Sequence, residues 1–281
     1  MSDSLRMDDG QFLLWRSLIE TRTGMVLPES RRSYLETAIS VRMRELDLND
    51  PGQYYDFVRA SEGQVEWTVL VDRLSVQETS FFRHKESCDF ISRHIYDWYK
   101  EGRGRDRPLA LWSAGCATGE EPYTMAIIAQ EVKERVNDEQ FYYGVTGSDI
   151  SLPALSKARK GIYTKNRLRN CDYAMMQFYF NAMEKDEYQV KDDLKKRVCF
   201  VGANILDRKE KPVKEADVIS CQNVLIYFSK HNKQKILENL VDSLLPGGVL
   251  LLGVGEVIGW EHPAVERVSS KTVLAYRKPA Q

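Results

Sequence analysis

From residue 109 onward, short apolar runs alternate with helical segments, and this alternation constrains the fold more than any other feature of the chain. A continuously apolar run is typical of a strand buried on both faces of a sheet. Strands that alternate with helices predict a doubly wound α/β fold with a parallel sheet, which binds ligands at the carboxyl ends of its strands. The predicted strands are Leu109–Ala114, Phe141–Asp149, Arg197–Ile205, Ala216–Asn223, Gly247–Gly255 and Lys271–Lys278.

The N-terminal part, from Asp9 to about Leu74, has helical periodicity instead. Apolar residues there recur three or four positions apart, so that each set lies on one helix face. Gly and Pro residues near positions 24 and 51 mark the breaks between helices. The apolar sets are Phe12, Trp15 and Ile19, then Leu35, Ile39, Met43 and Leu46, then Trp67, Leu70, Val71 and Leu74.

Composition excludes several classes of function. The net charge of −1 leaves no electrostatic footprint for nucleic acid. The five cysteines form no C-x-x-C pair and the four histidines are scattered, so we expect neither disulfides nor a metal site. The N-terminus has no apolar signal segment and no run approaches a membrane span. We therefore expect a cytoplasmic protein without membrane insertion.

The stretch "SAGCATGEEPY" places a glycine loop, Gly115–Gly119, between a predicted strand and a predicted helix. Glycines permit a tight turn and close approach of a ligand to the backbone. Glu120 and Glu121 follow at the helix start, where they would repel a pyrophosphate. A ligand with a positive charge, such as the amine and sulfonium of S-adenosylmethionine, fits better. For this loop alone, an equally good interpretation is that the acids complement the helix dipole.

Asp149, at the end of the second predicted strand, favours the ligand interpretation. An acid in that position hydrogen-bonds the ribose hydroxyls of nucleotide-like ligands. An acid after a second strand that follows a glycine loop is much less common than an acid that merely ends a strand. An adenosyl group is therefore expected at this edge of the sheet.

Five motifs occur in order along the chain: "QETSFFR", "SAGCATGEEPYTMAI", "GSDIS", "ANIL" and "CQNVLIYF". Together they resemble the chemotaxis-receptor glutamate O-methyltransferase family (CheR-type), from the N-terminal helices nearly to the C-terminus. The resemblance implies a Rossmann-like class I methyltransferase domain, S-adenosylmethionine as cofactor, and a small N-terminal all-helical domain. It places that helical domain at residues 1–80, the methyltransferase domain at 81–281, and an inserted antiparallel β-subdomain at about 165–200.

The resemblance also implies roles for individual residues. Arg83 and Tyr227 are the expected catalytic residues, Asp149 contacts the ribose, and Asn204 and Ile205 flank the adenine. The expected cofactor-binding residues are Gln77, Thr79, Arg83, Gly115, Glu121, Asp149, Asn204, Ile205, Gln222 and Asn223. Two positions depart from the family pattern, because Gln77 replaces the usual Asn and Gln222 replaces the usual Arg. Gln77 keeps an amide, whereas a charge is lost at Gln222.

The implied reaction transfers a methyl group to glutamate side chains of a methyl-accepting chemoreceptor cytoplasmic domain, and leaves S-adenosylhomocysteine. A glutamate is ionised at neutral pH, so it needs no general base, and none of the motifs supplies a histidine for that role. Two alternatives stay open. One is a methyltransferase of the same fold for another signalling protein or a small carboxylate, and the other is a cofactor-binding regulatory module without turnover.

The expected recognition elements of the receptor are weak in this sequence. The first 85 residues hold fewer basic than acidic residues, and on the second helix Arg31 and Arg42 share a face from which Arg44 points away. The stretch Phe180–Val190 in the expected insert has no glycine and is short. We therefore expect a monomer that does not depend on a receptor C-terminal peptide as a tether.

Overall fold

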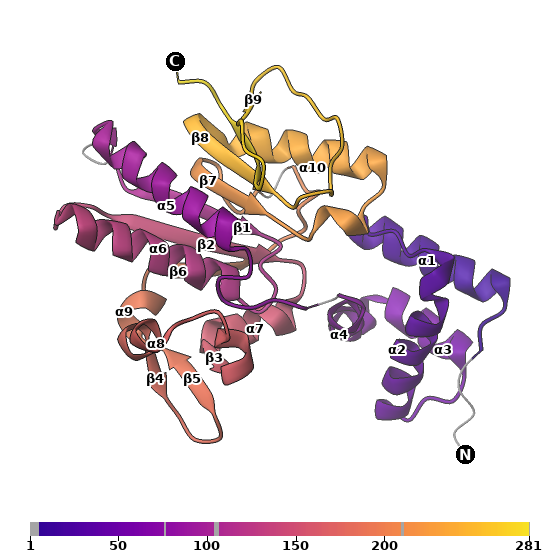
Figure 1. The fold of residues 1–281 in the computed structure, drawn as a ribbon. Coiled ribbons are helices and arrows are strands. Elements are labelled where there is room, and N and C mark those ends of the chain that lie inside the picture. The colour runs from indigo at the N-terminus through magenta and orange to yellow at the C-terminus, as the bar shows by residue number, and fades with distance from the viewer. Residues whose placement is uncertain (1–5, 76, 104–106, 209–210, 281) are drawn as a thin grey trace.

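The computed structural model describes residues 6–75, 77–103, 107–208 and 211–280. A small group of helices, α1 to α4, lies beside a larger α/β domain (Figure 1). These helices are α1 (Asp9–Thr23), α2 (Arg32–Glu45), α3 (Pro51–Arg59) and α4 (Gln64–Leu74). Side-chain caps mark the starts of two of them: the Asp8 side chain caps α1 in a capping box, and Asp50 caps α3 just before Pro51.

The apolar faces of these helices form their own core, as their periodicity predicts. Of the side chains in the predicted sets, Leu46 alone is exposed, at 37%. The helical periodicity is broken there because α2 ends at Glu45, so Leu46 lies beyond the last turn.

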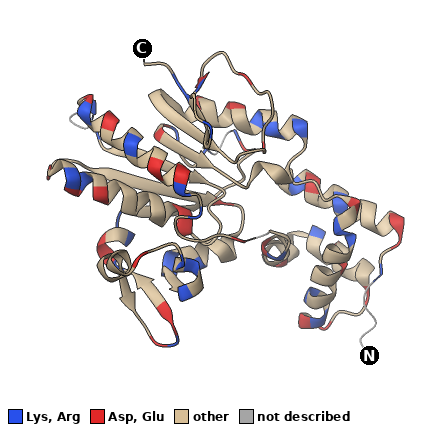
Figure 2. Cartoon of the chain, in the orientation of Figure 1, with Lys and Arg blue, Asp and Glu red and all other residues tan. Residues whose placement is uncertain are grey.

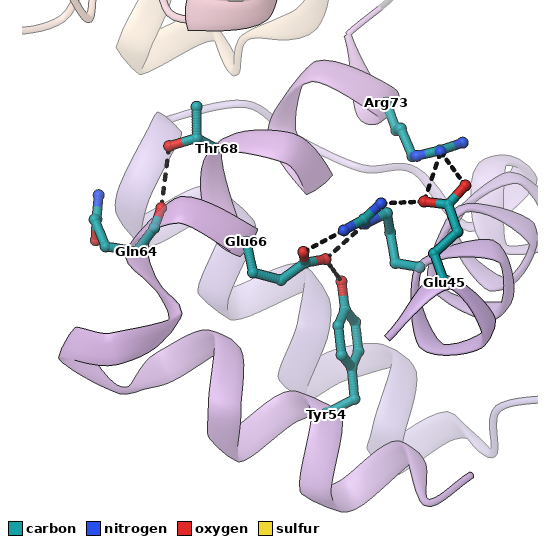
Figure 3. A network of polar contacts seen from close by, with 7 residues as sticks. Glu45, Tyr54, Gln64, Glu66, Thr68 and Arg73 are labelled. Atoms are coloured by element: carbon teal, nitrogen blue, oxygen red, sulfur yellow. Dashed lines mark hydrogen bonds and ion pairs between the residues drawn. The ribbon is translucent and has the colours of Figure 1, made fainter. Parts of the chain in front are cut away.

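A polar network joins α2, α3 and α4 (Figure 3). The Arg42 guanidinium donates Nε–H to Glu66 Oε1 at 2.8 Å, and the Tyr54 hydroxyl donates to the same oxygen at 2.7 Å. Arg73 and Arg42 also bind Glu45. Arg42 is therefore neutralised inside the helical domain. The sequence pattern places Arg42 on the same helix face as Arg31, but its charge does not extend a basic face of α2. Both signs of charge are interspersed over the two domains (Figure 2).

The large domain contains a seven-stranded sheet in the order β6-β2-β1-β7-β8-β10-β9. The first five strands in that order are parallel, and β10 pairs antiparallel with both of its neighbours, β8 and β9. The strands are β1 (Leu109–Ala114), β2 (Tyr143–Asp149), β6 (Val198–Gly202), β7 (Ala216–Cys221), β8 (Leu244–Leu252), β9 (Glu266–Arg267) and β10 (Leu274–Arg277). The predicted doubly wound sheet is confirmed, and β1 is the middle one of its five parallel strands.

Side chains alternate between two cores on opposite faces of this sheet. Leu109 and Leu111 of β1 face one core, with α5 (Lys85–Lys100) and α6 (Glu120–Val136), whereas Trp112 faces the other. Helix α10 (Lys230–Ser243) supplies the second core, and α7 (Leu152–Lys160) packs near β2 and β6. Because both faces are covered, ligands reach the sheet only at its strand ends.

A second, three-stranded antiparallel sheet in the order β3-β5-β4 is inserted between α7 and β6. Its strands are β3 (Ile162–Thr164), β4 (Phe180–Ala182) and β5 (Glu187–Val190), accompanied by the turn η4 (Lys165–Leu168) and helices α8 (Tyr173–Tyr179) and α9 (Asp192–Lys195). The sheet thus spans residues 162–190. Residues 198–200, which fall inside the sequence-based limits of the insert, belong to strand β6 of the large sheet.

Candidate active site

Two adjoining cavities open at the carboxyl ends of β1, β2 and β7. The larger has a volume of about 510 Å³ and extends from the glycine loop toward Arg83 and Gln222. The smaller has a volume of about 110 Å³ and lies around Asp149, Asn204 and the N-terminal domain. The two cavities share six lining residues: Val26, Arg31, Gly115, Ala117, Asn223 and Tyr227.

The glycine loop forms the floor of both cavities. Gly115 has φ +78°, and a Cβ there would lie 2.3 Å from a methyl carbon of Val224, so only glycine fits. Asp149, at the end of β2, holds the loop because its Oδ2 accepts the Ala117 N–H at 2.8 Å. Its Oδ1 accepts the Ser151 N–H, also at 2.8 Å. Burial raises the pKa of Asp149, and the backbone bonds oppose this rise.

The two acids after the loop have different surroundings. Glu121 lines the larger cavity and accepts a hydrogen bond from the Ser113 hydroxyl at 2.6 Å. Glu120 is fully buried away from the cavities, where it accepts the Thr118 hydroxyl at 2.7 Å. Burial raises the pKa of both carboxyls. Glu121 is thus the acid that can meet a cationic ligand, and Glu120 is structural.

Arg167, from the inserted β-subdomain, holds the "QETSFFR" segment in place. Its guanidinium donates to the carbonyl oxygens of Gln77 and Thr79, and its Nε lies 3.6 Å from Glu120 Oε1. Its own carbonyl accepts the Phe81 N–H at 3.0 Å. The insert therefore positions one wall of the site, a role that no motif in the sequence indicates.

Glu256 holds the loop after β7 through hydrogen bonds to backbone N–H groups. Its carboxylate accepts the backbone N–H groups of Asn223 at 3.0 Å and of Gly253 at 2.9 Å. Asn223 has φ +62° and its side-chain oxygen lies 2.9 Å from Nε2 of His84. Gln222 accepts the Ser87 hydroxyl and donates to the Ser220 hydroxyl, both at 3.0 Å. The neutral amide of Gln222 is therefore satisfied by neighbouring serines.

The N-terminal domain supplies the opposite wall through the segment after α1. The Val26 N–H donates to the Tyr227 carbonyl at 2.8 Å. Two side chains of the large domain bind the same segment: Asn204 donates to the Thr23 carbonyl at 3.2 Å, and Asn232 donates to that of Gly24 at 2.9 Å. The smaller cavity is thus enclosed between the two domains.

Arg83 and Tyr227 both line the larger cavity. Arg83 is exposed, and its Nη1 donates to the Glu78 carbonyl at 2.6 Å. Burial raises the pKa of Tyr227 while Arg31 and Arg83 oppose the rise, so its hydroxyl is protonated at neutral pH. A neutral phenol that shares a cavity with two guanidinium groups is suited to donating a hydrogen bond to a carboxylate.

All the site residues expected from the sequence line these two cavities. The larger is lined by Thr79, Arg83, Gly115, Glu121, Gln222, Asn223 and Tyr227, and the smaller by Gln77, Gly115, Asp149, Asn204, Ile205, Asn223 and Tyr227. Sequence reasoning missed Arg31, His84 and Ser87 as lining residues. The position of Ser87 one helical turn after "FFR" was the only available signal for it, and Arg31 was assigned to a helix face instead.

The charges of the site fit S-adenosylmethionine. Asp149 in the smaller cavity and Glu121 in the larger are carboxylates that form no ion pair among the described residues. Two unpaired carboxylates in a largely enclosed site are costly unless a cation or hydroxyl groups approach them. A ligand with ribose hydroxyls at one end and an ammonium and a sulfonium at the other meets both requirements.

Comparison with known proteins decides the family. The model of the CheR methyltransferase SAM-binding domain matches residues 77–274. The chain belongs to the CheR family. The CheR methyltransferase all-alpha domain matches residues 10–75. A chemotaxis protein methyltransferase of Borreliella burgdorferi is 31% identical over 86% of each chain. One from Salmonella typhimurium is 30% identical over 91% of this chain and 86% of its own.

This CheR-family protein is therefore a methyltransferase with S-adenosylmethionine as its cofactor. Within the ranges that the structure describes, no helix is both long and apolar enough to cross a bilayer. The family's fold, with an all-helical domain before the mixed sheet and a small antiparallel sheet, agrees with the architecture described above.

Proposed function

We propose that this protein transfers a methyl group from S-adenosylmethionine to glutamate side chains of a chemoreceptor cytoplasmic domain, forming glutamate methyl esters. Membership of the CheR family and the names of its chemotaxis relatives support the receptor as substrate. The observation that carries the choice of a carboxylate acceptor is the pair of guanidiniums, Arg31 and Arg83, beside Tyr227 in the larger cavity.

The residues of the site suit a reaction that needs orientation more than proton transfer. Bound S-adenosylmethionine supplies an electrophilic methyl group on a positively charged sulfur. With the cofactor bound, a carboxylate acceptor would take the methyl group while the electron pair of the C–S bond stayed with sulfur, so no proton would have to move. Arg83 and Tyr227 would orient the carboxylate and shield its charge, while Glu121 would hold the cofactor's ammonium and Asp149 its ribose.

We further propose that the protein acts as a cytoplasmic monomer and does not require a receptor C-terminal peptide as a tether. The connection between β4 and β5 supports the independence from a tether, because it is a tight turn with Lys185 and Asp186 in the left-handed region and without glycine. Calorimetric titration with peptides from receptor C-termini should give no measurable heat. Tight binding of any such peptide would refute the independence from a tether.

The decisive experiment is a methylation assay with a radiolabelled methyl donor and a panel of receptor cytoplasmic fragments from the same organism. We expect label on at least one fragment, released as methanol by base because the product is a carboxyl ester. Fragments with the acceptor glutamates changed to alanine serve as controls. Cofactor binding without transfer to any fragment would favour the regulatory module, and transfer only to another protein or a small acid would favour the other alternative.

The Arg83→Gln variant tests the role of Arg83 in the same assay. We expect S-adenosylhomocysteine affinity to stay within about 5-fold and kcat to fall by about 100-fold, because a charged hydrogen bond contributes about 1.5–3 kcal/mol. Unchanged turnover would remove Arg83 from the active site.

A further inference from the structure

Arg31 is a charged residue that lines both cavities of the site. Six residues line both cavities, and Arg31 is the one among them with a charged side chain. It ends the short turn η1 (Glu29–Arg31) just before α2, so it belongs to the N-terminal domain. The junction of the two cavities thus receives its one formal charge from outside the methyltransferase domain.

The junction matters because of the chemistry of the cofactor. The sulfonium joins the methionine part of S-adenosylmethionine to the adenosyl part, so an acceptor must approach where the two parts meet. The ternary complex brings the acceptor carboxylate to the larger cavity, whose lining holds two arginines, Arg31 and Arg83.

The surroundings of Arg31 leave its charge available. Its guanidinium carbon lies 5.8 Å from the ring centre of Tyr227 and 5.2 Å from that of Tyr34. Among the described residues it forms no ion pair, whereas its neighbour Arg32 is paired with Asp9 at 2.7 Å and with Glu29 at 2.8 Å. The two rings lie beside the Arg31 guanidinium and do not neutralise its charge.

We propose that Arg31 binds the carboxylate of the acceptor glutamate beside Tyr227, so that the N-terminal domain supplies a substrate-binding residue of the active site. The proposal rests on the proposed function. It adds Arg31 to Arg83 and Tyr227 as a residue for the acceptor, because Arg31 lines both cavities and so lies at the junction that the acceptor must approach. It also makes the helical domain a direct contributor to the site as well as a wall.

Steady-state methylation of a receptor cytoplasmic fragment tests the contact. We expect Arg31→Gln to lower kcat/KM by about 10- to 100-fold, because a charged hydrogen bond to the acceptor is lost. Arg31→Lys should retain part of the activity, since it keeps the charge but not the two-pronged donor geometry. Arg32→Gln is the matched control, and its kcat/KM should stay within about 2-fold of the wild type. Equal losses in Arg31→Gln and Arg32→Gln would overturn the proposal.

Cofactor binding provides a measurement that a purely structural role would not affect. A guanidinium at the junction repels the sulfonium of S-adenosylmethionine but not the neutral thioether of S-adenosylhomocysteine. Arg31→Gln should therefore change the ratio of the two dissociation constants by about 3- to 10-fold, in favour of S-adenosylmethionine. An unchanged ratio would place Arg31 away from the junction and refute the assignment.

A third experiment separates this proposal from the proposed function. N-acetylglutamate amide is titrated into the protein saturated with S-adenosylhomocysteine and followed by NMR, with N-acetylglutamine amide as the neutral control. The charged compound should shift the Tyr227 ring signals in the wild type and not in Arg31→Gln. If receptor methylation fails and this shift occurs, the site still binds carboxylates through Arg31. If the wild type shows no shift, the proposal is wrong, whatever the methylation assay shows.

Discussion

Replacing Arg167 with methionine should destabilise the protein mainly through Glu120. The Glu120 carboxylate is fully buried, and among the described residues it forms an ion pair with Arg167 at 3.6 Å. Removing one partner of a buried ion pair costs about 3–5 kcal/mol, because the other charge stays buried without a counter-charge. Arg167 is itself 33% exposed, so solvent screens the pair and about 2 kcal/mol is the reasonable figure.

Arg167→Met also removes the hydrogen bonds to the carbonyls of Gln77 and Thr79, which add about 1 kcal/mol. The total of about 3 kcal/mol corresponds to a fall in Tm of about 6 °C for a chain of this size. In a Glu120→Gln background, Arg167→Met removes only the hydrogen bonds to the Gln77 and Thr79 carbonyls, so Tm should fall by about 2 °C. The difference between the two backgrounds measures the contribution of the ion pair.

The pH dependence follows from the pKa of Glu120. Burial raises this pKa, and Arg167 opposes the rise, so Arg167→Met raises it further. A carboxyl with a raised pKa in the folded state destabilises the fold as pH rises through that pKa and the group becomes charged. The deficit of Arg167→Met against the wild type should therefore be largest near about pH 8 and smaller near about pH 5.

Thermal unfolding followed by circular dichroism, at both pH values and in both backgrounds, checks the magnitude and the sign together. A fall in Tm that is the same with Glu120 and with Gln at that position would show that the ion pair contributes nothing. A deficit that grows as the pH is lowered would refute the assignment of the effect to the buried carboxylate.

Three further predictions concern other parts of the molecule. Asp149→Asn should weaken S-adenosylhomocysteine binding by about 10- to 100-fold in calorimetry. The two carboxylate oxygens of Asp149 each accept a backbone N–H, so the amide nitrogen of the introduced asparagine would face one of these donors and lose that hydrogen bond. Unchanged affinity would contradict this prediction. Gly24→Ala should weaken the same binding more than Gly102→Ala. Both glycines have φ near +80°, but a Cβ at Gly24 would lie 1.9 Å from Leu206 Cδ1, whereas a Cβ at Gly102 would have no atom within 4 Å. Equal affinities of the two variants would show that the contact between the domains at Gly24 does not affect cofactor binding. Burial lowers the pKa of His94 to about 4, so the wild type should lose up to about 3 kcal/mol relative to His94→Met as the pH falls from about 6.5 toward 4, and parallel stability curves would exclude this contribution.

The sequence predicted those features of the fold that local pattern encodes. Apolar runs such as Leu109–Ala114 identify strands because a strand buried on both faces has to be apolar throughout, and β1 has these bounds. The glycine loop and Asp149 were predictable as a pair because the carboxyl ends of adjacent parallel strands meet at one edge. The prediction that Leu46 lies on the buried helix face is wrong, because helical periodicity does not indicate where a helix ends when no capping residue marks its end.

The rest of the site depends on contacts between segments that are far apart in the chain. Arg167 reaches the "QETSFFR" segment across about 90 positions, and Glu256 binds the Asn223 backbone across 33 positions, so no local pattern indicates either contact. Arg31 was predicted on the same helix face as Arg42. Arg31 lies in the turn before α2, and the two guanidiniums have different surroundings. Arg42 joins the polar network of the helical domain, and Arg31 lines the cavities.

The segment after α1, which joins the two domains at the smaller cavity, has a consequence for recombination between relatives. Thr23 and Gly24 bind Asn204 and Asn232 of the large domain, and Val26 binds the backbone of Tyr227. A helical domain borrowed from another member of the family would bring its own version of this segment. Such a chimera should bind cofactor only if the asparagines and the segment that they recognise are inherited as one unit.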